Sequence, residues 1–132
     1  MIVLPSNWRF TVFNNCGQTI GAADITVTGF RWRFVNGALE YDSEVQTFLS
    51  NSSLATASYE NGSPYDNTGE SAKWVGLDAL YKVTSPASAN GLVRLYLDAS
   101  DGTNWPDNGD SLVVASFSMG ASQTRRRWLR LG

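Results

Sequence analysis

The chain has 132 residues, a formal net charge of −2, one cysteine and no histidine. This length predicts a single domain with its own hydrophobic core. The absence of histidine excludes the Ser-His-Asp triad and histidine metal ligands, and one cysteine allows neither an internal disulfide nor a cysteine zinc cluster. No stretch has the roughly 18 apolar residues of a membrane span, and the first five residues lack the basic flank of a signal peptide.

The composition favours β structure. Gly, Ser, Asn and Thr together account for 47 residues, whereas lysine occurs twice and glutamate four times. The first group is typical of turns and strands, and helices in soluble proteins draw on Lys, Glu, Ala and Leu. Cys16 is predicted to be an unpaired residue at a turn, which indicates assembly in a reducing cytoplasm.

The first predicted strand covers residues 8–13, where Trp8, Phe10 and Val12 alternate with other side chains. This period of two residues is typical of a strand with one buried face. The segment that follows, 14–17, has the sequence Asn-Asn-Cys-Gly and is predicted to be a turn.

The second predicted strand, residues 24–35, changes its hydrophobic pattern midway. Apolar side chains occupy odd positions before Gly29 and even positions after it, namely Ile25, Val27, Phe30, Trp32 and Phe34. A strand keeps one apolar face only if its period stays at two residues. We therefore predict a β-bulge or bend near Gly29; the alternative is a strand buried on both faces.

Asn36-Gly37 follows directly and predicts a hairpin, because a type I′ turn needs positive φ at both central residues. The return strand is predicted at 38–41, with weaker strands at 45–49 and 54–59. Residues 60–72 then form a long polar connection, which indicates a mobile or functional loop.

Four more strands are predicted in the second half of the chain, at 74–84, 92–99, 111–119 and 125–131. The total is about eight strands without an intervening helical pattern. We therefore predict an all-β fold, a single antiparallel β-sandwich or jelly-roll-like domain that covers residues 1–132. Residues 125–132 are predicted to be a terminal strand or an arm.

Two acidic segments are candidates for ligand binding or chemistry. Residues 98–110 are rich in oxygen ligands, and the preferred interpretation is a hairpin connection built from Asx turns and glycines; a calcium site is the alternative, and no cofactor is predicted. Glu40, Asp42 and Glu44 alternate and could form a pair of catalytic carboxylates, or else a solvated face.

The aromatic content, with five tryptophans and five tyrosines, favours a carbohydrate-binding hypothesis. Trp105 and Tyr65 lie in or beside predicted loops and are the candidate platforms for a sugar or a protein partner. The alternative for Trp105 is a tryptophan that caps the end of the core. The tryptophans within predicted strands fit burial in the core or between subunits.

The most specific charge feature is a basic cluster near the end of the chain: Arg125, Arg126, Arg127, Trp128 and Arg130. It holds four of the ten basic residues, so the rest of the chain carries 6 basic against 12 acidic residues, a balance of −6. Arginine next to an aromatic side chain is typical of protein interfaces. The cluster therefore predicts either docking on an acidic partner or packing on the protein's own acidic body, and not nucleic-acid binding.

Two segments, 73–84 and 91–106, resemble small β-sandwich proteins encoded among the structural genes of tailed bacteriophages. In the second segment a Leu-Tyr-Leu strand runs into an Asp-Gly-Thr-Asn turn, and residues 14–20 and 65–67 are similar in character. The resemblance covers about half of the chain.

The resemblance implies a non-enzymatic virion protein, assembled in the host cytoplasm. A capsid decoration (cement) protein is the first expectation, and a tail or baseplate component or a carbohydrate-binding module is the alternative. The implied partners are other virion proteins, such as major capsid or tail proteins, and further copies of the chain. A glycan is an additional candidate partner, and neither a membrane nor nucleic acid is expected.

Overall fold

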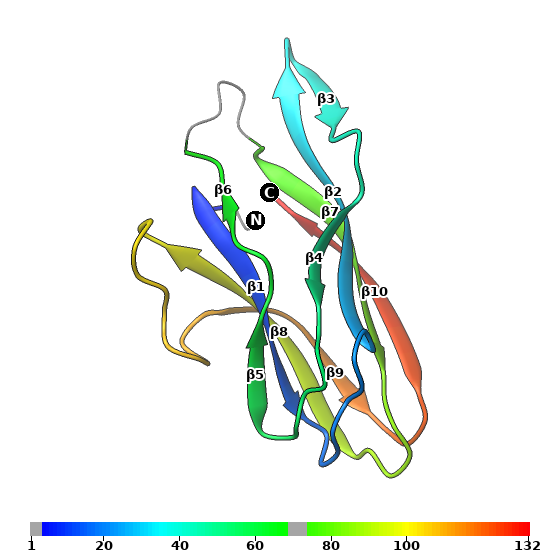
Figure 1. Cartoon of the computed structure of the whole chain (residues 1–132). Helices are drawn as coiled ribbons and strands as arrows, with labels where there is room; N and C mark the ends of the chain where they lie inside the picture. Colours follow the sequence, from blue (N-terminus) through cyan, green and yellow to red (C-terminus); the bar gives the residue numbers. More distant parts are fainter. Residues whose placement is uncertain (1–3, 69–73) are drawn as a thin grey trace.

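The computed structural model describes residues 4–68 and 74–132. Two antiparallel β-sheets pack against each other as a β-sandwich (Figure 1), which confirms the predicted fold class. No residue in these two ranges is helical, so none of them belongs to a helix long and apolar enough to cross a bilayer.

The first sheet is built around the N-terminal strand and has the order β5-β1-β8-β9, with β6 also paired to β1. Its strands are β1 (Asn7–Asn15), β5 (Ser58–Asn61), β6 (Tyr65–Asp66), β8 (Gly91–Ser100) and β9 (Leu112–Met119). Since β5 and β6 pair with different parts of β1, they share one edge of this sheet.

The second sheet has the order β10-β7-β2-β3, with β4 also paired to β2. Its strands are β2 (Ile25–Val35), β3 (Ala38–Tyr41), β4 (Gln46–Ser50), β7 (Gly76–Thr84) and β10 (Thr124–Leu131). β7 and β8 are consecutive in the chain but belong to different sheets, so the chain crosses the sandwich between them.

The core lies between the two sheets and takes the side chains that alternation predicts. Trp8, Phe10 and Val12 of β1 are fully buried, as expected. Tyr81 of β7 stacks on Phe117 of β9 with ring centroids 4.6 Å apart, and its hydroxyl donates a hydrogen bond to a backbone carbonyl of β8. This contact joins the two sheets through the centre of the core.

The bulge predicted in the second strand is not in that strand. β2 pairs with β7 without interruption from Ile25 to Trp32. The irregularity lies in the pairing with β4, where Val27 stands opposite Leu49 and Thr28 opposite Thr47, so Phe48 of β4 is the extra residue. β2 therefore keeps its period of two residues, and its aromatic side chains after Gly29 lie on the other side of the sheet from the core.

The Asn36-Gly37 hairpin is confirmed, with φ of 51° and 79° at the two residues. β2 pairs with β7 only as far as Trp32, whereas its pairing with β3 runs from Trp32 to Val35. The end of this hairpin is therefore a two-stranded ribbon that extends past β7 (Figure 1).

The predicted loop at 60–72 is partly ordered into the first sheet. β5 extends to Asn61, and Tyr65 pairs with Trp8. Residues 69–72 lie outside the described residues. The weak strand predicted at 54–59 begins later, at Ser58, and Leu54 forms only an isolated bridge.

The arginine-rich C-terminal segment is a strand of the second sheet. β10 pairs with β7 along its whole length, from Thr124 opposite Thr84 to Leu131 opposite Leu77. Leu129 and Leu131 are buried in the core. This segment is the edge strand of its own sandwich, so it is not a free arm.

Leu129→Ala is expected to lower the free energy of unfolding by about 2–4 kcal/mol, because it removes a buried leucine from the edge strand. The matched control is Arg126→Ala, an exposed position on the same strand, which should change stability by less than about 0.5 kcal/mol. Urea unfolding measures both. Equal and negligible effects would contradict the integration of β10 into the core.

Candidate functional site on the outer face of the second sheet

The outer face of the second sheet, which points away from the first sheet, carries aromatic side chains. Leu77, Ala79 and Tyr81 of β7 are fully buried, so the alternate residues of β7 lie on the outer face. Through register, the residues opposite them share this face: Phe30 lies opposite Asp78. The apolar residues at even positions of β2 are therefore directed away from the core.

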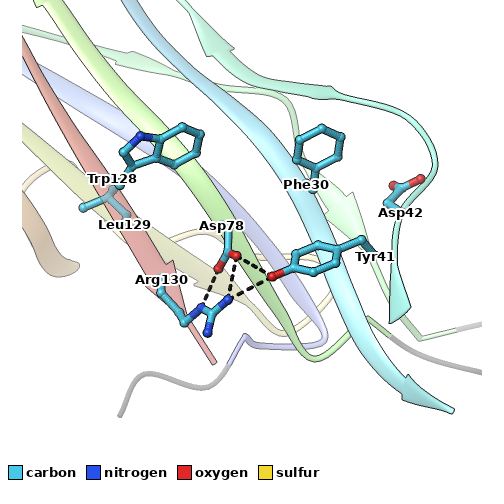
Figure 2. Close-up of a pocket in the computed structure, with 7 residues that line it drawn as sticks. All are labelled: Phe30, Tyr41, Asp42, Asp78, Trp128, Leu129 and Arg130. Carbon is cyan, nitrogen blue, oxygen red and sulfur yellow. Dashed lines mark hydrogen bonds and ion pairs between the residues drawn. The ribbon is translucent and has the colours of Figure 1, made fainter. Parts of the chain in front are cut away.

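A pocket of about 590 Å³ lies on this outer face. Its lining comes from β2, the end of β3, β7 and β10, and consists of Phe30, Tyr41, Asp42, Asp78, Trp128, Leu129 and Arg130 (Figure 2). We call this feature the aromatic groove. Tyr41 and Trp128 lie on opposite sides of Asp78 in Figure 2, and their side chains are 42% and 66% exposed.

The carboxylate of Asp78 is the polar centre of the aromatic groove. Arg130 donates to both of its oxygens, with distances of 2.7 Å from Nε to Oδ1 and 2.8 Å from Nη2 to Oδ2. The Tyr41 hydroxyl donates to Oδ2 at 2.8 Å, and Trp32 Nε1 donates to Oδ1 at 3.2 Å. One side chain of β7 thereby ties together β2, β3 and β10.

These contacts shift the ionisation of the groove. The hydrogen bond from Arg130 holds the pKa of Asp78 below its usual value, despite partial burial, and the bond from Tyr41 adds to this effect. The hydrogen bond to Asp78 raises the pKa of Tyr41, and the same carboxylate raises that of Arg130. Asp78 and Arg130 are therefore both ionised at neutral pH and form a pair with no net charge.

Two glycines make room for Trp32, the donor at the end of the groove. A Cβ on Gly76 would lie 2.2 Å from Cζ2 of the Trp32 ring, and a Cβ on Gly132 would lie 3.1 Å from its Cη2. Trp32 is only 6% exposed although it belongs to the outer face. The alternative prediction for this strand, burial on both faces, therefore holds at Trp32, whereas Phe34, the next residue on the outer face, is 62% exposed.

The structure divides the predicted arginine cluster between two sides of β10. Arg130 and Trp128 belong to the aromatic groove. Arg125 and Arg127 lie over the ring of Phe117, at 5.0 and 5.2 Å from its centroid, along the flank between β10 and β9.

Arg126 is exposed. One of the two predicted uses occurs in part, since Arg130 pairs with the protein's own Asp78. Docking on an acidic partner stays a prediction, for which Arg126 is exposed.

The two predicted aromatic platforms are not part of the aromatic groove. Tyr65 stacks on the buried Trp8 at 4.6 Å between ring centroids and covers one end of the core. Trp105 is half-buried, with the guanidinium of Arg9 4.2 Å from its ring centroid.

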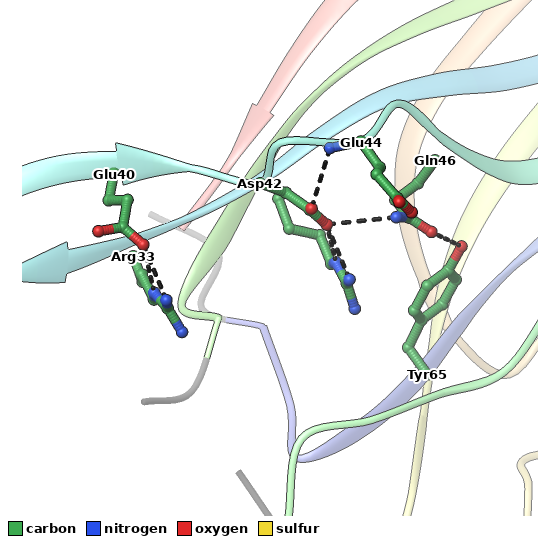
Figure 3. Close-up of polar contacts among 7 residues, drawn as sticks. Arg33, Glu40, Asp42, Glu44, Gln46 and Tyr65 are labelled. Atoms are coloured by element: carbon green, nitrogen blue, oxygen red, sulfur yellow. Dashed lines mark hydrogen bonds and ion pairs between the residues drawn. The ribbon is translucent and has the colours of Figure 1, made fainter. Parts of the chain in front are cut away.

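Two of the candidate catalytic carboxylates, Glu40 and Asp42, are paired with arginines of β2 (Figure 3), and the backbone of the third, Glu44, donates to Asp42. Glu40 accepts from Arg33, and Asp42 accepts from Arg31 at 2.7 Å. Burial favours a higher pKa for Asp42, but the bonds from Arg31, the Glu44 backbone and a glutamine outweigh it and lower the pKa. The lowered pKa keeps Asp42 ionised at neutral pH.

The candidate calcium loop is organised by its own hydrogen bonds. Asp98 is buried and accepts from Thr11 and Arg9, and Asp101 accepts from the backbone of Thr103 and Asn104 in an Asx turn. Across residues 4–68 and 74–132, no group of three or more His, Cys, Asp or Glu side chains could hold a metal ion.

Sequence reasoning singled out Asp42, Trp128 and Arg130 but missed Phe30, Tyr41 and Asp78 as residues of the aromatic groove. The available signal was the even-numbered apolar series in 24–35, which was interpreted as a break in the strand. If the alternation is continued through Gly29, the same series predicts an aromatic outer face.

No family model matches the chain, and no match is found among curated proteins or solved structures. The functional argument therefore rests on the residues and geometry described above.

Asp78→Asn is expected to lower the free energy of unfolding at pH 7 by about 1 kcal/mol, because the ion pair with Arg130 is lost in a site open to water. The folded-state pKa of Asp78 is lowered, so its stabilising contribution is complete above the unfolded-state value of about 3.9 and is lost as the pH falls through the folded-state value. Urea unfolding at successive pH values should show the difference from wild type shrinking below about pH 4.

The control is Asp107→Asn, an exposed loop carboxylate, which should leave stability unchanged at neutral pH. A difference between wild type and Asp78→Asn that stays constant down to acidic pH would contradict the role given to this ion pair.

Proposed function

We propose that this protein is a non-enzymatic structural subunit of a bacteriophage virion. A capsid decoration protein that stabilises the shell through contacts with neighbouring subunits is the preferred role, and a tail or baseplate component is the alternative. The proposal combines the resemblance of segments 73–84 and 91–106 with one structural observation, the apolar end of the β2–β3 hairpin.

The hairpin tip, defined as Phe34 and Leu39, exposes large apolar side chains. The two residues are opposite each other in the β2–β3 ladder and are 62% and 43% exposed. They lie beyond the last β2–β7 pair, so no third strand supports this part of the ribbon. A two-stranded ribbon is marginally stable alone, and burial against a partner would stabilise it.

The mechanism that we propose is clamping. A subunit that binds the assembled shell but not its separate components shifts the equilibrium towards the shell by mass action. The hairpin tip supplies apolar area for this contact, and the exposed Arg126 on the opposite edge of the same sheet supplies a charged one.

A carbohydrate-binding module remains the second candidate, and it is supported by a different feature, the aromatic groove. The two functions are compatible in one chain, because the hairpin tip and the groove involve different side chains of the same sheet.

The double variant Phe34→Ser/Leu39→Ser is expected to lose association while it keeps the wild-type fold, because both side chains lie outside the core. Sedimentation velocity of the full chain, alone and mixed with purified phage capsids or tails, measures this association. Circular dichroism and thermal unfolding verify the fold.

The matched control is Leu112→Ser/Val113→Ser, which changes two exposed apolar residues of β9 in the other sheet and should associate as wild type does. A wild-type chain that stays monomeric at high concentration and does not co-sediment with either particle would refute the structural role.

A further inference from the structure

We propose that the aromatic groove is a binding site for a neutral oligosaccharide, with Trp128 and Tyr41 as stacking faces and Arg130 as a hydrogen-bond donor. This inference goes beyond the structural role, and neither depends on the other. It also relocates the sugar-binding hypothesis from Trp105 and Tyr65 to the outer face of the second sheet.

The shape of the groove fits a short chain of sugar rings. Its volume of about 590 Å³ lies within the usual range for small-molecule sites. Tyr41 on β3 and Trp128 on β10 belong to the two outermost strands of the sheet, with β2 and β7 between them, so a ligand that contacts both rings crosses the width of the sheet. Phe30 lies between them and meets Tyr41 edge-on, with ring centroids 6.5 Å apart.

The aromatic faces match one property of a sugar ring. A pyranose presents several C–H groups on one side, and these carry partial positive charge that is attracted to the electron-rich face of an aromatic ring. Trp128 is the most exposed of the large apolar side chains in the described residues, at 66%. Trp128 lines one pocket together with Phe30 and Tyr41, and apolar surface gathered in one place in this way is typical of a ligand-binding groove.

The polar groups match the other property, the hydroxyl groups at the rim of the ring. Asp78 accepts four hydrogen bonds from protein donors, so its two oxygens have no remaining capacity. Arg130 Nη1 makes no hydrogen bond with any described residue and is free to donate to a ligand hydroxyl. The Tyr41 hydroxyl donates to Asp78 and accepts from Arg130, which fixes the orientation of its ring.

Charge and backbone accessibility argue against other ligands. The Asp78–Arg130 pair is neutral overall, and Asp42 at the margin is paired with Arg31, so the groove does not select an ionic ligand. The floor is formed by β2 and β7, which are inner strands of the sheet and use their backbone groups in ladders on both sides. An extended peptide would therefore find no main-chain partners there.

The test is titration calorimetry and tryptophan fluorescence of the full chain with cellohexaose, maltohexaose, mannohexaose, xylohexaose and chitohexaose as probes. At least one probe should bind saturably, and its affinity should rise from the monosaccharide to the trisaccharide and then level off. Trp128→Ala should weaken binding by at least about tenfold through loss of a stacking face. Trp128→Phe should restore part of this loss, and Tyr41→Ala should weaken binding as well.

The control is Leu112→Ala, which changes an exposed apolar residue of the other sheet and should bind as wild type does. Thermal unfolding verifies that each variant is folded. Replacement of Trp128 is expected to preserve the fold because its side chain is exposed. Failure of all five probes to bind at millimolar concentration would overturn the proposal.

Two other results would also overturn it. The first is an equal loss of affinity in Leu112→Ala. The second is evidence that the groove is a protein contact. In that case the wild-type chain would self-associate or bind the apolar dye ANS, Trp128→Ala would abolish this behaviour, and no glycan would bind.

Discussion

The unbroken register between β2 and β7 is the constraint on which the outer face of this protein depends. Because the period of two residues continues through Gly29, every even position of β2 after it lies on the side away from the core. Phe30 is therefore half-buried and Phe34 exposed, whereas Trp32 is buried on the outer face because the backbone at Gly76 and Gly132 packs against its ring. The same register sets Phe30 against Asp78, and the pairing of β7 with β10 adds Arg130 to that row.

Asp78 turns this row into a defined site. A carboxylate at the centre of a sheet face, with donors from three neighbouring strands, fixes the orientation of Trp32, Tyr41 and Arg130. The donors lower the pKa of the carboxyl, so the charge that holds them persists at neutral pH. The aromatic groove is thus organised before any ligand arrives, which reduces the ordering cost of binding. The two side chains of the hairpin tip, Phe34 and Leu39, are not tied to Asp78 and remain exposed.

Prediction from sequence succeeded where local patterns determine the outcome. The buried face formed by Trp8, Phe10 and Val12 follows from the period of a strand, and the Asn36-Gly37 turn follows from the φ requirement of a type I′ turn. The bulge near Gly29 was the wrong prediction. When apolar side chains shift from odd to even positions along a strand, either the strand contains an extra residue or its outer face is also apolar. The sequence of β2 alone does not distinguish these two cases. The extra residue belongs to its partner β4, at Phe48.

The sequence by itself determined the class of this protein: an all-β chain without histidine chemistry, with a basic edge on an acidic body. Only the tertiary structure decided which side chains act together. Tyr41, Asp78 and Arg130 are separated by 37 and 52 positions in the chain, yet they share one hydrogen-bonded cluster. The physical reason is that strand order and register are set by packing of the whole core, whereas hydrophobic periodicity specifies only the two faces of each strand.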